Sequence, residues 1–161
     1  MVGVTPPRIE LRNVSKTFVG NGRTVHALHD VSFKVMPGEF VTVIGASGSG
    51  KSTLFNLCVG LLEPDEGSII IDGSQPPSRL GMLGYMPQRD LLLPWRSVLD
   101  NVVLPRDIKG VPRKESRQTA LEMVRRFGLE GFEHDYPSAL SGGMRQRAAL
   151  LRTWLTGCDT L

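Results

Sequence analysis

The hydrophobic and polar positions in the first part of the chain predict short strands. Residues Ile9–Val14 and Val25–Val35 contain alternating or β-branched stretches, and the turn-rich Gly20-Asn21-Gly22 separates them. This pattern predicts two antiparallel strands joined by a turn. The apolar, β-branched run Phe40–Ile44 then predicts a buried strand.

A glycine-rich turn follows this strand, and a helix is predicted after it, because apolar residues recur at helical spacing and Gly60 can end the helix. The apolar positions are Leu54, Leu57, Cys58 and Leu61. Two more short strands are predicted at Ser68–Ile71, which Asp72-Gly73 closes, and at Leu83–Met86.

The second half of the chain has the spacing of helices. Ser97 is placed to cap a short helix, and Pro112 with Arg113 begins a longer one that Gly128 ends. The apolar face of the longer helix consists of Ala120, Met123, Val124 and Phe127. A third helix is predicted to begin at the Ser141 cap, with its apolar face made of Met144, Ala148 and Leu151.

Composition narrows the classes of protein to consider. With 161 residues, 40% of them hydrophobic and 22% charged, the chain has the composition of a soluble globular domain. The formal charge of +3 is too small to indicate a nucleic-acid partner. No apolar run approaches the ~20 residues of a membrane span. The segment Met1–Pro7 lacks the features of a secretory signal. We therefore expect a cytoplasmic chain with no membrane span of its own.

The spacing Gly45-x4-Gly50-Lys51-Ser52 predicts a phosphate-binding loop. Glycines let successive backbone N–H groups turn inward as an anion nest. The Lys51 ammonium can then reach the β- and γ-phosphates, and the Ser52 hydroxyl is placed to ligate Mg²⁺. A flexible Gly/Ser linker is the alternative, but the structured flanks argue against it. The loop comprises Gly45, Ala46, Ser47, Gly48, Ser49, Gly50, Lys51, Ser52 and Thr53.

Other residues carry weaker signals that sequence patterns alone leave open. Phe18 could stack on an adenine face, although a Phe in such a segment is more often a packing residue. Gln88 follows a predicted strand end and is a candidate to contact Mg²⁺ or an attacking water, or a plain loop residue. The helix start at Ser141-Gly142-Gly143 is either a second anion site or an ordinary cap. Trp95 is either core or a protein contact.

Together, Gly45–Thr53 and Leu140–Arg147 resemble the Walker A loop and the LSGGQ-type signature of ATP-binding cassette (ABC) ATPases, here in the variant form LSGGMRQR. The resemblance covers essentially the whole chain. The order and spacing of Phe18 (the A-loop aromatic), the Walker A loop, Gln88 (the Q-loop) and the signature match that family. The resemblance makes Phe18 and Gln88 expected site residues.

The resemblance implies an α/β P-loop NTPase domain over residues 1–161, with N-terminal antiparallel strands and a helical subdomain at about 89–140. It implies ATP and Mg²⁺ as cofactors, with Ser52 and Gln88 at the metal. It also implies a head-to-tail homodimer, in which Ser141, Gly142 and Gly143 of one subunit close over the ATP held by the other subunit's P-loop. The segments Leu93-Pro94-Trp95 and Leu99-Asp100-Asn101-Val102 resemble the subgroup that serves nitrate, sulfonate, taurine or pyrimidine-precursor importers.

The chain also departs from the family pattern. Phe18 stands where many members have Tyr, and Met144 stands where the plain signature has Gln. Family members continue into an apolar strand ending in Asp-Glu, the Walker B carboxylates, and then to a switch His. The chain ends at Thr160-Leu161, where that strand would begin, so we expect a C-terminally truncated domain. Its histidines match none of these roles and are expected at surface or packing positions: His26, His29 and His134.

Two functions from different classes follow. The resemblance implies an ATPase subunit that couples ATP hydrolysis to import of a small solute through separate transmembrane permease subunits, at the inner face of the cell membrane. The alternative is a non-hydrolysing ATP-binding regulatory or interaction module. A dinucleotide-binding oxidoreductase is a distant third, because Gly45-x-x-Gly48-x-Gly50 is not G-x-G-x-x-G.

Overall fold

The computed structural model describes residues 5–20 and 22–160 of the chain. Met1–Val4, Asn21 and Leu161 lie outside the described residues, and with them lie the first residues of the N-terminal segment and the middle of the predicted turn. The chain divides into two compact units, Met1–Leu80 and Gly81–Leu161. Each unit is described below by itself.

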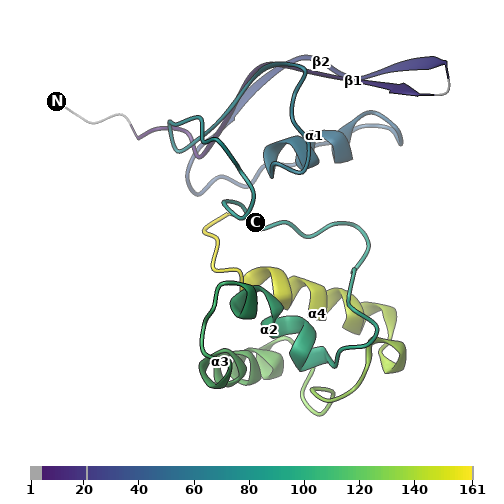
Figure 1. Cartoon of the computed structure of the whole chain (residues 1–161), viewed down its shortest axis with the longest axis vertical. Helices are drawn as coiled ribbons and strands as arrows, with labels where there is room; N and C mark the ends of the chain where they lie inside the picture. The colour runs from purple at the N-terminus through teal and green to yellow at the C-terminus, as the bar shows by residue number, and fades with distance from the viewer. Residues whose placement is uncertain (1–4, 21, 161) are drawn as a thin grey trace. The chain divides into compact units, whose positions relative to one another are not determined.

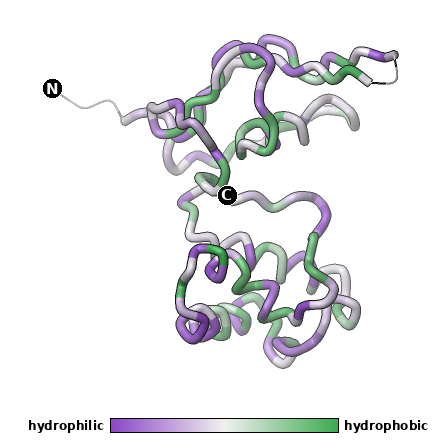
Figure 2. The backbone as a smooth tube through the Cα atoms, in the orientation of Figure 1, coloured by the Kyte–Doolittle hydropathy of each residue, from purple (hydrophilic) through white to green (hydrophobic). Residues whose placement is uncertain are grey.

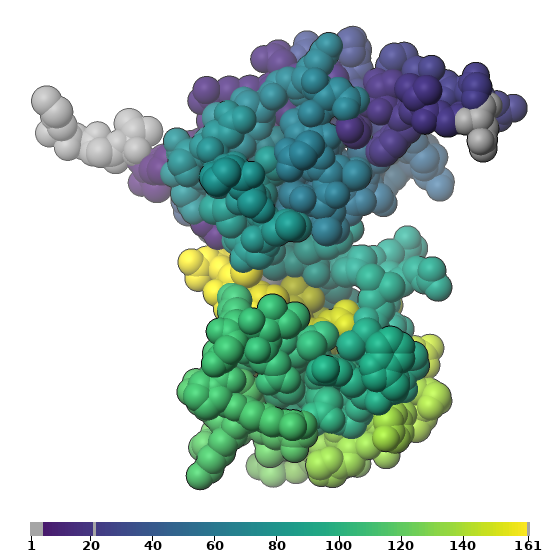
Figure 3. Space-filling view, in the orientation of Figure 1, coloured from purple at the N-terminus to yellow at the C-terminus, as the bar shows by residue number. Residues whose placement is uncertain are grey.

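The first unit contains a three-stranded antiparallel sheet of order β2-β1-β3. Its strands are β1 (Ile9–Gly20), β2 (Arg23–Val35) and β3 (Glu66–Ile71). Figure 1 shows β1 and β2 as a long two-stranded ribbon, and in Figure 3 its far end stands clear of the rest of its unit. The two predicted N-terminal strands and the strand at Ser68–Ile71 are confirmed. The buried apolar residues of this sheet lie in β1 and β3 and include Leu11, Val14, Ile69 and Ile71.

The helix α1 (Lys51–Cys58) follows the glycine-rich loop, as the spacing predicts. Leu54, Leu57 and Cys58 are its buried face. Burial raises the pKa of the Cys58 thiol to about 11, which keeps it a neutral packing residue at neutral pH. Leu61 lies beyond the end of the helix and is exposed.

The predicted strand at Phe40–Ile44 is wrong. These residues form no strand among the described part of the chain, and Phe40 and Ile44 are 95% and 90% exposed. A strand is stabilised by hydrogen bonds to a neighbouring strand, and within residues 5–20 and 22–160 nothing pairs with this segment. Its apolar side chains are consequently left at the surface.

The second unit is built from helices α2 (Val98–Ile108), α3 (Arg113–Arg126) and α4 (Gly142–Trp154), with a short 3₁₀ helix η1 (Pro137–Ala139). All three predicted α-helices are confirmed. The Ser97 hydroxyl caps α2 by accepting from the Asp100 amide at 3.1 Å. Figure 2 shows hydrophobic stretches in α2 and α4 and a more hydrophilic α3. Their shared core includes Val98, Val102, Val103, Ala120, Val124, Leu129, Ala148 and Leu151.

The predicted strand at Leu83–Met86 is also wrong, because these residues form a bend followed by irregular backbone. The Gly84 amide donates to the Thr160 carbonyl at 2.7 Å, and the Thr153 hydroxyl lies 3.5 Å from the Tyr85 carbonyl. Contacts of this kind anchor the segment, but the described residues form no ladder of strand hydrogen bonds with it. Leu83 is nevertheless buried.

Candidate functional site

The glycine-rich loop has positions where its backbone conformation favours glycine, Gly48 and Gly50. Gly50 caps α1 in the left-handed region with φ 87°. A Cβ at Gly50 would lie 2.3 Å from the Ala27 carbonyl oxygen, so the loop packs directly against β2. A Cβ at Gly45 would lie 2.6 Å from the Ser49 hydroxyl, so the loop also closes tightly on itself. Glycine is therefore required at position 50, where the backbone is left-handed and a carbonyl of β2 lies close.

The Lys51 ammonium lies over the loop. Its Nζ donates to the Gly45 carbonyl at 2.7 Å and to the Ala46 carbonyl at 2.6 Å, with the Ser49 hydroxyl 3.3 Å away. No carboxylate appears among these partners, and the first turn of α1 carries no acidic residue. The positive charge is thus held by neutral oxygens and is available to an anion.

The N-terminus of α1 adds donors to this site. The first backbone N–H groups of a helix have no intrahelical partner, and the helix dipole places partial positive charge there. The cap residue Gly50 supplies no side-chain hydrogen bond, so these donors are not satisfied by a cap. Ser52, in the same turn, is exposed. Amides, ammonium and hydroxyl together form an arrangement that suits a phosphate chain with a bound cation.

Phe18 shares a face of the hairpin with this loop because of a β-bulge. Lys16 pairs with Leu28, and Phe18 pairs with Val25, so Ala27 is an extra residue on β2. Directly paired residues point to the same side of a sheet, and the bulge puts Val25 and Leu28, three residues apart, on one face. A Cβ at Gly50 would lie 3.1 Å from Leu28 Cδ2 on that face.

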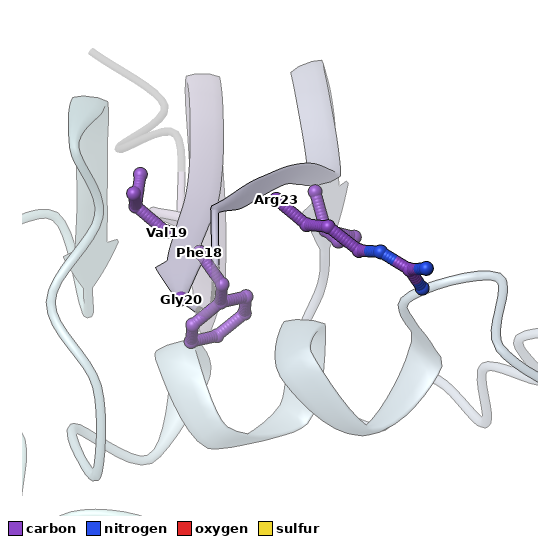
Figure 4. Close-up of a pocket in the computed structure, with 5 residues that line it drawn as sticks. Phe18, Val19, Gly20 and Arg23 are labelled. Carbon is purple, nitrogen blue, oxygen red and sulfur yellow. The ribbon is translucent and has the colours of Figure 1, made fainter.

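The Phe18 ring is therefore on the loop side of the sheet and is 41% exposed. It lines an open hollow with Val19, Gly20, Arg23 and Val25. In Figure 4 the Phe18 ring and the Arg23 side chain extend in different directions from the hairpin. An exposed aromatic ring at the edge of a hollow offers a flat apolar surface.

Gln88 and the helix start at Ser141 both lie in the second unit. Gln88 is exposed, and its backbone oxygen accepts from Gln146 Nε2 at 3.2 Å. Ser141 caps α4, its hydroxyl accepting from the Met144 amide at 3.3 Å. A Cβ at Gly143 would meet nothing within 4 Å among the described residues. An alanine side chain at position 143 would therefore clash with none of the described residues.

Two arginine side chains of α4 contact the segment around Gln88, and the sequence patterns did not predict these contacts. Arg152 donates to the carbonyls of Asp90 and Leu91 at 2.6 and 2.7 Å, and Arg145 Nε lies 3.3 Å from the Asp90 carboxylate. Burial lowers the pKa of Arg152, with Asp90 opposing the shift. In the sequence these arginines look like the solvated face of a helix, so no local pattern predicts that they bind the segment around Gln88.

Trp95 is not a core residue, because it is 71% exposed. The loop that carries it is held from beneath by Asn101, which is fully buried. The Asn101 side chain accepts from the Leu93 amide at 2.7 Å and donates to the carbonyls of Leu93, Arg96 and Ser97, each at 3.0 Å. The loop therefore presents Trp95 on a fixed backbone.

The glycine-rich loop packed against β2, its lysine and the helix that follows it define a P-loop protein of the α/β class. The family model described as ABC transporter matches residues 28–161, and the chain belongs to that family. Among the residues described, no helix combines the length and the apolar character that a membrane span requires.

Similar proteins agree with this assignment. The chain is 52% identical to the formylaminopyrimidine import ATP-binding protein ThiZ of Halalkalibacterium halodurans, over 78% of this chain and 48% of that protein. It is 46% identical to the taurine import ATP-binding protein TauB of Rhizobium johnstonii, over 87% of this chain and 53% of that protein. A dimeric structure of MJ0796, a bacterial ABC transporter cassette, matches with a TM-score of 0.85 and 34% identity, over 93% of this chain and 70% of that one. The chain spans about half the length of the curated relatives it matches.

Proposed function

We propose that the whole protein is the ATP-binding subunit of an ABC importer, which couples ATP binding and hydrolysis to solute import through separate transmembrane subunits. The observation that best supports this function is the Lys51 ammonium, held 2.7 and 2.6 Å from the loop carbonyls of Gly45 and Ala46 with no carboxylate among its partners. The relatives named for formylaminopyrimidine and taurine import support a small solute of the nitrate, sulfonate or taurine type.

The residues of the loop fit Mg·ATP, because they offer a cation held by neutral oxygens, helix N-terminal amides with no side-chain cap and an exposed hydroxyl. When bound, Mg·ATP supplies the phosphoryl group that is transferred to water. We propose that Phe18 stacks on the adenine, Lys51 holds the β- and γ-phosphates, and Ser52 with Gln88 holds Mg²⁺. Gln88 also orients the attacking water. The backbone amides of the other loop residues would hold the phosphate chain: Gly45, Ala46, Ser47, Gly48, Ser49, Gly50 and Thr53.

We also propose a head-to-tail dimer with a second copy of the protein, located at the inner face of the membrane through its permease partners. Gly142 and Gly143 leave the start of α4 accessible, and the nearest atom to a Cβ at Gly142 would be Arg145 Nη2 at 3.9 Å. This open helix start, with Ser141 beside it, suits the phosphates of a nucleotide bound by the other copy. Residues 89–140 would form the helical subdomain that contacts the permease.

Residues 1–161 alone are expected to bind ATP weakly and to release no phosphate steadily. Hydrolysis needs a general base near the attacking water. After the signature, the only carboxylate in the chain is Asp159, which is exposed and follows no apolar strand. Phosphate release with Mg·ATP, measured beside a Lys51→Ala control, tests this. Steady turnover that disappears in the control would place a base within these residues.

Trp95 is proposed to contact a helix of the permease. Its side chain is 71% exposed on a loop that Asn101 fixes, and Leu91 in the same loop is 58% exposed. In the full-length protein, Trp95→Asp should reduce co-purification with the transmembrane subunits at least severalfold and leave ATP binding intact. Ile108→Asp, at another exposed apolar position of the same unit, is the control. Equal loss in both variants would contradict a specific contact at Trp95.

A further inference from the structure

Lys16 lies beside the Phe18 ring, on the same face of the hairpin. Its Nζ is 5.8 Å from the ring centroid, within the range of a cation–π contact. The Lys16 side chain is only 16% exposed, although lysine side chains usually extend into solvent. The ammonium is therefore held in place rather than free to sample the surface.

Asp65 fixes the position of the Lys16 ammonium. Its Oδ1 lies 2.6 Å from Lys16 Nζ, and its Oδ2 accepts from the Thr17 amide at 2.7 Å. Its own backbone amide donates to the Ser15 carbonyl at 3.0 Å. Asp65 thus forms three hydrogen bonds with three successive residues of β1, Ser15 to Thr17, immediately before Phe18. These partners also lower the pKa of Asp65, so the carboxylate stays charged at neutral pH.

The position of this contact on the sheet explains its importance. The pairing of β1 with β3 ends at Ser15 and Glu66, and within residues 5–20 and 22–160 no other strand pairs with β1 on the β3 side beyond that point. The Asp65 carboxylate takes the Thr17 amide that another strand would otherwise bond. The backbone at Thr17 and the ammonium over Phe18 are fixed by the same side chain.

We propose that Lys16 and Asp65 form a positioning pair that holds the Phe18 ring ready for a nucleobase. This inference rests on the proposed function, in which Phe18 stacks on adenine. The Lys16 charge is neutralised by Asp65 at 2.6 Å, which makes it a poor phosphate ligand. The pair therefore contributes to binding of the base and leaves the phosphates to Lys51. The ammonium favours one placement of the ring, and 41% of Phe18 stays exposed for stacking.

The test uses calorimetry on the full-length protein and compares Mg·ATP with tripolyphosphate, which has phosphates and no base. Lys16→Met keeps an unbranched apolar stem and removes the charge. We expect it to weaken ATP binding roughly threefold to tenfold and to leave tripolyphosphate binding unchanged. Asp65→Asn should act in the same direction, whereas Lys16→Arg should retain most of the affinity. Lys34→Met is the matched control, because Lys34 pairs with Glu10 at 3.1 Å elsewhere on the hairpin.

A double-mutant cycle separates positioning from a direct contact. In a Phe18→Ala background, Lys16→Met should have no further effect on ATP. An undiminished effect in that background, an equal loss of tripolyphosphate affinity, or unchanged ATP binding in a folded Lys16→Met would each overturn the inference. If Lys16→Met does not fold, Asp65→Asn decides by the same criteria. A wild-type full-length protein that binds neither ligand would overturn the proposed function, and the inference with it.

Discussion

Replacing Lys51 by alanine is expected to weaken Mg·ATP binding on the order of 100-fold. A hydrogen bond from a charged donor to phosphate contributes up to about 3 kcal/mol. Lys51 carries the positive charge of the loop, and its own partners are neutral oxygens. The Gly45 and Ala46 carbonyls would also lose their cation and face the phosphates unscreened. Ser52→Ala should weaken binding less, because it removes one metal ligand. Titration of a fluorescent ATP analogue measures both.

Lys34→Ala serves as the control for Lys51→Ala, because it removes the same charge from the same unit. Lys34 is 61% exposed and pairs with Glu10, so its loss should leave nucleotide affinity within about twofold. Unchanged affinity in both Lys51→Ala and Ser52→Ala would refute the phosphate-binding loop. A loss as large in Lys34→Ala would indicate general charge attraction instead of a site.

Replacing Asn101 by alanine is expected to lower the free energy of unfolding of the second unit by about 3 to 4 kcal/mol. Asn101 is fully buried, and its amide group satisfies the Leu93 amide and three backbone carbonyls. Those backbone groups would lose their partners without gaining water. Both tryptophans, Trp95 and Trp154, belong to this unit, so urea unfolding followed by tryptophan fluorescence reports on it alone.

Gln118→Ala provides the comparison for Asn101→Ala. It removes an amide side chain from α3 at an exposed position, so the free energy of unfolding should change by less than about 0.5 kcal/mol. A similarly small change in Asn101→Ala would show that the loop around Trp95 does not depend on the buried amide. The expected large loss would connect the stability of the unit to the surface that presents Trp95.

The phosphate-binding loop could be predicted because its causes are local. Gly45, Gly50 and Lys51 lie within seven residues, and the ammonium of Lys51 bonds to carbonyls five and six positions earlier. Helix ends were predictable for the same reason, since Ser97 and Ser141 bond to amides three residues along the chain. Contacts at such short range are encoded by residue type and spacing alone.

The strands at Phe40–Ile44 and Leu83–Met86 failed for the opposite reason. An apolar run becomes a strand only when another segment offers hydrogen bonds along its edge, and residue pattern does not state whether that partner is present. The two N-terminal strands succeeded because each is the other's partner and a short turn joins them.

By itself, the sequence determined the anion-binding loop, the helix caps and the resemblance to ABC ATPases, all of which depend on residues close together in the chain. Tertiary structure alone decided which side of the sheet Phe18 occupies, because the extra residue Ala27 shifts the register of two strands. It alone placed Lys16 and Asp65 together, 49 positions apart in the chain, and left Trp95 exposed above the buried Asn101. These features depend on pairings between distant segments, whose free energies are set by packing and hydrogen bonding that no local spacing encodes.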